Sequence, residues 1–183
     1  KDRGTNAIGT ALVEGKPVSI NGSEHYLELN GFLSCAAAPI YMPDGSITGV
    51  LDISTDKSTY HPHTIGLVKA TVHSLEKQLF YASEKQYCVI AKLHPSCEGL
   101  GSMAEGLIGL SEEGLMLGAD RAALTYLGLA SIDIGNIKFH QIVDCHWNRV
   151  FDFAQTSQTP QELRTHTDKR LYFDFMLSKA YCR

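Results

Sequence analysis

SCAAAPIYMPDGSITGVLDIS, residues 34–54, contains two nearly apolar runs on either side of a tight turn. Pro43, Asp44 and Gly45 have turn chemistry, because proline presets φ and glycine accepts a positive φ. Apolar runs that flank such a turn predict a β-hairpin. Because both runs are almost continuously apolar, we expect a central hairpin that is covered on both faces.

The whole chain has the composition of a globular protein. Its 183 residues are 44% hydrophobic and 20% charged, with a formal net charge of −4, which suits one ordinary domain or two small ones and gives no sign of a nucleic-acid-binding surface. No apolar run approaches the roughly 18 residues that span a membrane, and no signal peptide opens the chain. The five cysteines are widely and irregularly spaced, which indicates reduced thiols in a cytosolic protein.

A long helix is predicted after the hairpin. Residues 63–86 contain no proline and a single glycine, and their apolar residues alternate at spacings of three and four, as in positions a and d of a heptad. These residues are Ile65, Val68, Val72, Leu75, Leu79 and Ala82. The run is shorter than a secure coiled coil. Two interpretations stay open: the stripe packs on the chain's own sheet, or it contacts a second helix in a homodimer, because it is narrower than a typical core face.

Shorter elements are predicted elsewhere. Before the hairpin, residues 17–20 read as a strand and 24–29 as a short helix. In the second half, 87–93 is a strand or a helix tail, 105–110 and 115–119 form another hairpin, 119–127 is a helix closed by Gly128, 132–153 is largely helical, 155–159 is a polar loop, and 171–177 is a half-buried strand. The pattern predicts an α+β fold in two halves joined by the long helix.

No residue pattern indicates catalysis, a metal or a cofactor. His61 and His63 frame a proline, but a metal site needs at least three protein ligands, so capping is the simpler interpretation. His140 and Cys145 do not share a helical face, and nothing else signals a haem. The phosphate-loop spacing fails as well, because five residues rather than four separate Gly9 from Gly15. No Ser-His-Asp order and no paired carboxylates stand out.

Two residues of the opening stretch have alternative interpretations. Cys35 lies among small residues without the helix N-terminus or basic neighbour that activates a thiol, so a buried structural cysteine is favoured. Asp52 follows an apolar run, where it either orients a ligand or makes a hydrogen bond at the strand end.

Several motifs, in order, resemble a known family. GTNAIGTAL (4–12), Glu24-His25, the opening stretch and HPHTIGLV (61–68) resemble the GAF domain of acetoin-regulator-type, sigma-54-dependent bacterial transcriptional activators. LHP (93–95) and EGLIGLSEEGLMLGADRAALTYLGL (105–129) resemble the PAS domain that follows in such regulators. The resemblance covers nearly the whole chain. It implies two sensor-type domains, 1–86 and 87–183, each an antiparallel sheet flanked by helices. It also implies that the chain begins inside the GAF domain, and that the ATPase and helix-turn-helix modules lie outside this sequence.

The resemblance implies a small cavity in each domain, with room over the sheet left by Ala36, Ala37 and Ala38. The polar candidates for the GAF-like cavity are Thr5, Asn6, His25, Cys35 and Asp52, and the weaker candidates for the PAS-like cavity are His140 and Trp147. The alternative is that side chains fill the cavities, because apolar interiors normally pack densely.

The expected function is signal sensing in the cytoplasm. A small metabolite or a regulatory protein shifts a two-state arrangement, and the helix within 61–86 relays the shift, with Ile65 to Leu79 as a homodimer seam. This part of the regulator is expected to contact neither DNA nor a membrane. Two rivals remain open: a GAF-type redox enzyme using Cys35, which needs a resolving thiol nearby, and an interaction scaffold with filled pockets.

Overall fold

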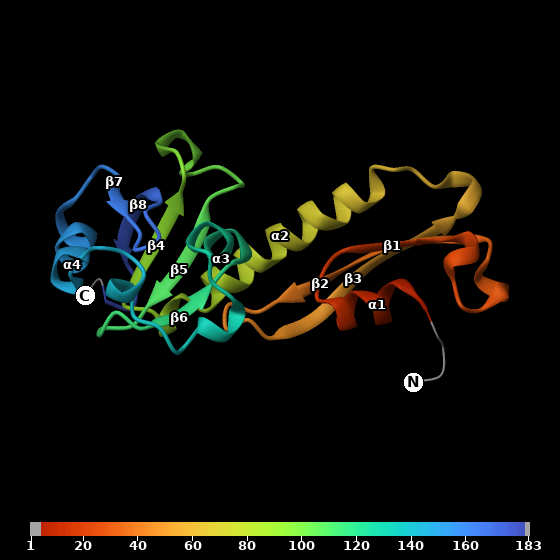
Figure 1. Cartoon of the computed structure of the whole chain (residues 1–183), viewed down its shortest axis with the longest axis horizontal. Helices are drawn as coiled ribbons and strands as arrows, with labels where there is room; N and C mark the ends of the chain where they lie inside the picture. Colours follow the sequence, from red (N-terminus) through yellow and green to blue (C-terminus); the bar gives the residue numbers. More distant parts are fainter. Residues whose placement is uncertain (1–4, 182–183) are drawn as a thin grey trace. The chain divides into compact units, whose positions relative to one another are not determined.

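The computed structural model describes residues 5–181 and divides into two compact units (Figure 1). The first unit contains the residues up to Met42 together with Ser46–Glu76, and the second contains Pro43–Gly45 together with the residues from Lys77 onward. Each unit has one antiparallel sheet, and residues 5–181 contain four α-helices. The predicted α+β class is therefore confirmed. None of the helices in these residues has the length and apolar character needed to cross a membrane.

The sheet of the first unit is built around the predicted hairpin. Its strand order is β1-β2-β3, with bounds Val18–Asn21, Leu33–Tyr41 and Ile47–Asp56. The hairpin register pairs Cys35 with Ser54 and Ala37 with Asp52. Gly45 has a φ of 85° in the turn, a conformation that glycine adopts without strain. The hairpin prediction is confirmed.

Two helices cover opposite faces of β2, which is the central strand (Figure 1). Helix α1 (Ala7–Glu14) packs on the face that carries Cys35 and Ala37. Helix α2 (Thr64–Ala82) places Val68 and Val72 on the face that carries Ala36 and Ala38. The expectation of cover on both faces is met by β2, whereas the edge strand β3 is partly exposed along its length.

Helix α1 was not predicted, although both of its ends carry clear signals. Asn6 caps its start by accepting a 2.8 Å hydrogen bond from the Gly9 N–H, and Gly15 ends it in the left-handed conformation at φ 63°. The predicted helix over 24–29 is instead a pair of short 3₁₀ turns, Gly22–Glu24 and Glu28–Asn30.

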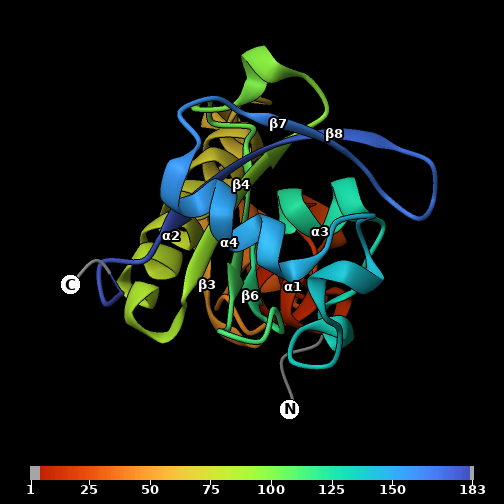
Figure 2. The ribbon, with the colours of Figure 1, turned by 90° about the vertical axis from the view of Figure 1, so that its left-hand side faces the viewer.

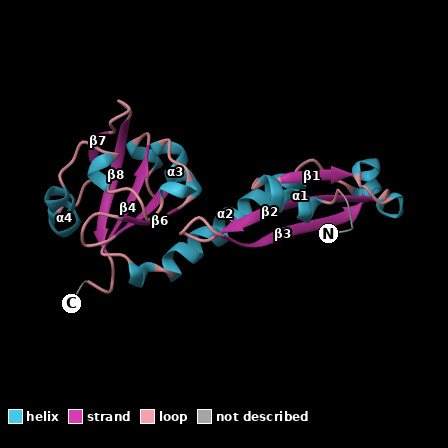
Figure 3. Cartoon of the chain, turned by 60° about the horizontal axis from the view of Figure 1, so that its bottom comes forward, coloured by secondary structure: helices cyan, strands magenta, loops and turns pink. Residues whose placement is uncertain are grey.

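The second unit has a five-stranded sheet in the order β6-β5-β4-β8-β7 (Figure 1). Figures 2 and 3 show β4, β6, β7 and β8 of this sheet from other directions. In chain order the strands are β4 (Val89–His94), β5 (Gly106–Leu110), β6 (Met116–Ala119), β7 (Gln161–Arg164) and β8 (Arg170–Leu177). Helices α3 (Arg121–Leu127) and α4 (Trp147–Thr156) join the core on one face. A smaller cluster on the other face contains Phe80, Tyr87, Ile90 and Leu107. The hairpin, the helix closed by Gly128 and the alternating strand near the C-terminus are confirmed.

The predicted helix over 132–153 is wrong. Only its last part is α-helical, in α4, because the backbone before it bonds to other segments and forms only short 3₁₀ turns, Ser131–Asp133 and Phe139–Gln141. The Met116 N–H donates to the Ile137 carbonyl at 3.0 Å, and the His166 N–H donates to the Ile142 carbonyl at 2.9 Å. Those carbonyls are therefore not used in helical bonds. Helix α4 also extends into the predicted polar loop, and the short strand β7 follows without having been predicted.

Candidate functional site

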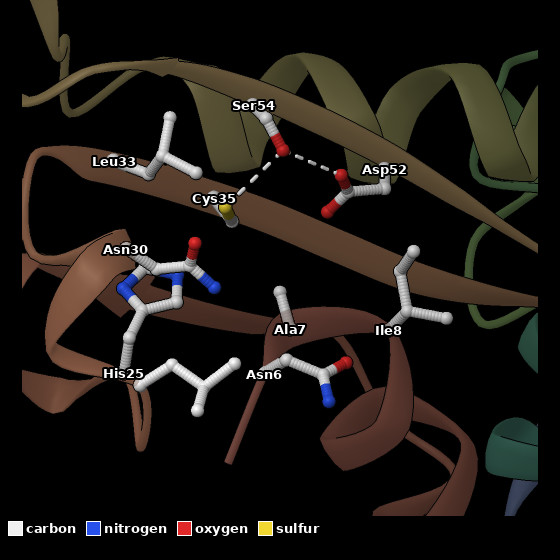
Figure 4. A pocket seen from close by; sticks show the side chains of 10 residues that line it. Asn6, Ala7, Ile8, His25, Asn30, Leu33, Cys35, Asp52 and Ser54 are labelled. Carbon is white, nitrogen blue, oxygen red and sulfur yellow. Dashed lines mark hydrogen bonds between the residues drawn. The ribbon is translucent and has the colours of Figure 1, made fainter. Parts of the chain in front are cut away.

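A cavity of about 410 Å³ lies in the first unit, beside α1 and the sheet (Figure 4). Its volume falls within the range of small-molecule sites. It is lined by Asn6, Ala7, Ile8, His25, Leu27, Asn30, Leu33, Cys35, Asp52 and Ser54. The lining side chains therefore come from four parts of the first unit: helix α1 with its cap, the segment 25–30, β2 and β3.

The structure brings together four of the five polar candidates named for the first domain. Asn6, His25, Cys35 and Asp52 line the cavity, whereas Thr5 does not, and the Thr5 carbonyl accepts a backbone hydrogen bond from Tyr26. Side-chain alternation explains the grouping of the strand residues. Because Cys35 pairs with Ser54 and Ala37 pairs with Asp52, these side chains share the α1 face of the sheet.

The expectation that Ala36, Ala37 and Ala38 leave room for a cavity is wrong, because helices pack directly on all three. Ala37 packs with Ala7 and Ala11, while Ala36 and Ala38 pack against α2. Their small side chains let both helices approach β2 closely, and the cavity opens further along the strands instead.

Three side chains on the sheet form a hydrogen-bond chain that ends on a carboxylate (Figure 4). The Ser54 hydroxyl donates to Asp52 Oδ2 at 2.7 Å, and the Cys35 sulfur lies 3.1 Å from the Ser54 oxygen. Since the single hydroxyl hydrogen of Ser54 points to Asp52, the Cys35 thiol is the donor in the second bond. Ser54 was missed in the sequence, although its position two residues after Asp52 on one strand placed it on the same face.

His25 is buried, with 7% of its surface exposed. Its Nδ1 lies 3.0 Å from the Gly22 carbonyl oxygen, and because a carbonyl only accepts, Nδ1 carries the proton. In the neutral ring Nε2 is then an acceptor. Neither His25 Nε2 nor Asp52 Oδ1 has a hydrogen-bond partner among residues 5–181, although both atoms are buried. Figure 4 shows the His25 ring and the Asp52 carboxylate directed into the same space.

The rest of the lining is mostly apolar, with Ala7, Ile8, Leu27 and Leu33 around the polar groups. Asp52 is the formally charged side chain among the described lining residues when histidine is neutral. A mainly apolar wall with a few convergent polar groups is typical of a small-ligand site.

The thiols and potential metal ligands do not form a second kind of site in the described chain. Within residues 5–181, Cys35, Cys88, Cys97 and Cys145 are all free, and His, Cys, Asp and Glu side chains form no group of three placed to hold a metal. Burial raises the pKa of the Cys88 and Cys145 thiols, which keeps both protonated and unreactive. Cys35 therefore forms no disulfide with another cysteine among residues 5–181.

The weaker candidates of the second unit make contacts of another kind. The Trp147 indole N–H donates to the Glu112 carbonyl at 2.6 Å, and its ring packs against Gly114. The His140 carbonyl accepts a hydrogen bond from the His166 ring. Both contacts tie together loops of the second unit.

The two halves of the apolar stripe predicted on α2, Ile65 to Leu79, differ in burial. Val68 and Val72 are buried on the α2 face of the first unit's own sheet, and Ile65 packs against the same cluster. Leu75 and Leu79 are only partly buried. The first half of the stripe is thus occupied within the chain, and the second half is more accessible.

Comparison with known proteins shows that the chain is similar to the N-terminal regions of transcriptional activators. Residues 1–77 match the family model described as MimR, N-terminal domain. Homologues of the chain are the AcoR and MimR transcriptional activators. The resemblance to the N-terminal region of an acetoin-regulator-type activator is therefore confirmed.

Individual relatives cover different shares of the chain. The acetoin dehydrogenase operon transcriptional activator AcoR of Bacillus subtilis (strain 168) is 46% identical over 90 residues, which are 49% of this chain and 15% of that protein. The signal-transduction and transcriptional-control protein of Clostridium beijerinckii is 26% identical over 176 residues, which are 95% of this chain and 27% of that protein. The chain therefore spans a minor part of these relatives.

A solved structure, the E. coli DhaR(N)–DhaL complex, matches at a TM-score of 0.41 with 13% sequence identity, over 94% of this chain and 64% of that one. At this TM-score the likeness does not establish a shared fold.

Proposed function

We propose that this chain is the signal-sensing region of a sigma-54-dependent transcriptional activator, and that the cavity of the first unit binds a small metabolite. The proposal assigns a GAF-like domain to residues 1–86 and a PAS-like domain to 87–183. The observation that carries it is the pair of buried, unpaired polar atoms, His25 Nε2 and Asp52 Oδ1, in a largely apolar cavity. Unpaired buried polar groups cost stability unless a bound molecule satisfies them.

Strand β2 provides the route by which an occupied cavity acts on α2. Cys35 faces the cavity, whereas its neighbour Ala36 faces α2 and packs with Val68 and Val72. A ligand that moves β2 by a fraction of an ångström therefore changes the packing under α2. Since densely packed interfaces shift between discrete arrangements, such a change favours one of two helix positions.

The proposed output is a homodimer that acts in the cytoplasm through α2, with DNA contacted by another part of the regulator. Leu75 and Leu79 are the part of the stripe that remains accessible. The Leu75→Asp variant should dissociate the dimer in sedimentation-velocity experiments while far-UV circular dichroism stays native. Ser74→Asp, on the exposed side of the helix, is the matched control. A dimer that persists in Leu75→Asp contradicts this assignment.

The metabolite-binding proposal is tested by thermal unfolding of the chain against a panel of small polar carbon compounds. A compound at a hundredfold its Kd stabilises the binding state by about 2.7 kcal/mol. Protection of Cys35 from alkylation by the same compound reports binding in this cavity, because the Cys35 side chain is part of its wall. Compounds that neither raise the melting temperature nor protect Cys35 would leave a protein partner as the signal and overturn metabolite binding.

A further inference from the structure

The unpaired polar atoms of the cavity are both hydrogen-bond acceptors. His25 Nδ1 is occupied as a donor to the Gly22 carbonyl, so in the neutral ring Nε2 is an acceptor, and it is unpaired. Asp52 Oδ2 already accepts from Ser54, so Oδ1 is the unpaired oxygen of an acceptor-only group. Two buried acceptors from different elements therefore face one space (Figure 4).

The protein's own hydroxyl and thiol donors in this wall are already committed. The Ser54 hydrogen points to Asp52, and the Cys35 thiol hydrogen points to Ser54. Asn6 uses its side-chain oxygen to cap α1. A molecule that satisfies His25 Nε2 and Asp52 Oδ1 must bring its own donors.

The surroundings also limit the charge of that molecule. Asp52 repels a carboxylate at close range. Ala7, Ile8, Leu27 and Leu33 form an apolar remainder of the wall that offers little compensation for the lost hydration of an ion. A neutral compound with a short apolar frame meets both conditions.

We infer that the cavity selects a small neutral compound with at least two hydroxyl groups, one donating to His25 Nε2 and one to Asp52 Oδ1. The inference rests on the proposed function and specifies its ligand class. A compound of the same frame without donors leaves both acceptors buried and unpaired, and sites built to bond a hydroxyl discriminate strongly against such analogues.

The first experiment measures the Kd of matched probes by isothermal titration. The probes are the 1,2-, 1,3-, 1,4- and 2,3-butanediols, which vary the spacing of the donors, and the dimethyl ether of each, which keeps the oxygens and removes the donors. 4-Amino-1-butanol and 4-hydroxybutyrate supply a cation and an anion on the same frame. At least one diol should bind at least tenfold more tightly than its dimethyl ether and than either ion.

The second experiment ties the preference to the two acceptors. Asp52→Asn replaces a carboxylate oxygen with a donor amide at unchanged size, and His25→Phe removes the ring acceptor. Each should weaken the best diol at least tenfold and change its dimethyl ether little. Asp152→Asn, at an exposed position on α4, is the control and should leave both values unchanged. The His25 Nε2 nitrogen resonance should shift when the diol binds and stay unshifted with the ether.

The outcomes separate the inference from the function on which it rests. If ethers or the anion bind as tightly as the diols and protect Cys35 from alkylation, the cavity is a ligand site and the donor requirement is wrong. Tighter binding of the amino alcohol overturns the preference for a neutral ligand. If no probe binds or protects Cys35, the diol inference fails, and the wider metabolite panel then decides the proposed function.

Discussion

Ser54 holds Asp52 from two residues further along the same strand, with a 2.7 Å hydrogen bond from its hydroxyl to Asp52 Oδ2. The bond fixes which carboxylate oxygen remains for other partners. Because Ser54 is exposed, this hydrogen bond affects the orientation of Asp52 more than the free energy of unfolding.

Replacing Ser54 separates orientation from stability. Ser54→Ala should change the free energy of unfolding by less than about 1 kcal/mol, because the bond is exposed. It should weaken the tightest-binding butanediol about fivefold, because the carboxylate loses its fixed rotamer. Titration calorimetry measures the Kd, and Ser54→Thr should restore it by returning the hydroxyl. Equal affinity in Ser54→Ala and the unchanged protein would show that Asp52 is positioned by something else.

The cysteines should differ in their rates of alkylation. Cys97 is exposed, whereas Cys35, Cys88 and Cys145 are buried, and burial raises the pKa of the Cys88 and Cys145 thiols. Because the thiolate is the reacting form, Cys97 should react with iodoacetamide at least tenfold faster than these three at pH 8. Peptide mass spectrometry over time gives the rates. A Cys35 that reacts faster than Cys97 would revive the redox interpretation.

The side chain of Tyr87 packs directly against the backbone of Gly109 and Gly118. Gly109 pairs with Gly118 across β5 and β6, and a Cβ at Gly109 would lie 2.5 Å from the Tyr87 ring. Gly109→Ala should therefore lower the free energy of unfolding of the second unit by about 1–3 kcal/mol through overpacking. Urea denaturation followed by fluorescence measures it. Gly49→Ala is the control, because no atom lies within 4 Å of its added Cβ, and it should leave stability unchanged within about 0.5 kcal/mol.

The same tyrosine predicts an alkaline loss of stability. Burial raises the pKa of Tyr87 to about 12, although a hydrogen bond with Ser83 lowers it in part; the charge of Asp44 adds a smaller increase. The unfolded chain loses this proton near pH 10 and the folded chain near pH 12. The contribution of Tyr87 to the free energy of unfolding is therefore fully present below pH 10. It falls by about 2–3 kcal/mol as the pH rises to 12.

Urea denaturation at pH 9, 10 and 11 measures this decline. Tyr87→Phe has no proton to lose at this position, so its slope against pH should be smaller than that of the unchanged protein. Equal slopes would contradict a raised pKa at Tyr87.

A largely buried ion pair anchors the start of the second unit. The Lys77 ammonium lies 3.8 Å from Glu105 Oε1, with side-chain exposures of 15% and 9%, and Glu105 Oε2 accepts a 2.6 Å bond from the Gly101 N–H. Removing the cation leaves a buried carboxylate without its countercharge, so Lys77→Ala should cost about 1–3 kcal/mol.

Thermal unfolding measures the cost, and Lys77→Met separates the charge from the packing of the stem. The exposed pair Lys16–Glu14 supplies the control, because Lys16→Ala should change stability by less than about 0.5 kcal/mol. Equal effects of Lys77→Ala and Lys16→Ala would contradict a role for burial.

The parts of the fold that could be predicted are those with a local signal. The turn Pro43-Asp44-Gly45 between two apolar runs was enough to predict the hairpin. The spacing of apolar residues such as Val68 and Val72 was enough to predict α2. Helix α1 was recoverable from Asn6 and Gly15 but was overlooked. The segment 132–146 was not recoverable from helical periodicity, because its backbone is satisfied by distant partners such as Met116 and His166.

The site follows the same division. Asn6, His25, Cys35 and Asp52 were grouped from the family resemblance, and the structure places all four around one cavity. Ser54 was missed because a lone serine on a strand carries no sequence signal. That His25 Nε2 is unpaired depends on a hydrogen bond to the Gly22 carbonyl, a relation that only the folded chain shows.

The three consecutive alanines of β2 have a consequence for how this kind of protein can diversify. Each packs between the sheet and a helix, so a larger residue there would push the helix away and lower the free energy of unfolding by about 1–3 kcal/mol. Ile8 and Leu27, by contrast, line the cavity while 47% and 37% of their surfaces are exposed to solvent. New chemical preferences can therefore arise by exchanging these two residues one at a time, while the packing of the helices on β2 stays constant.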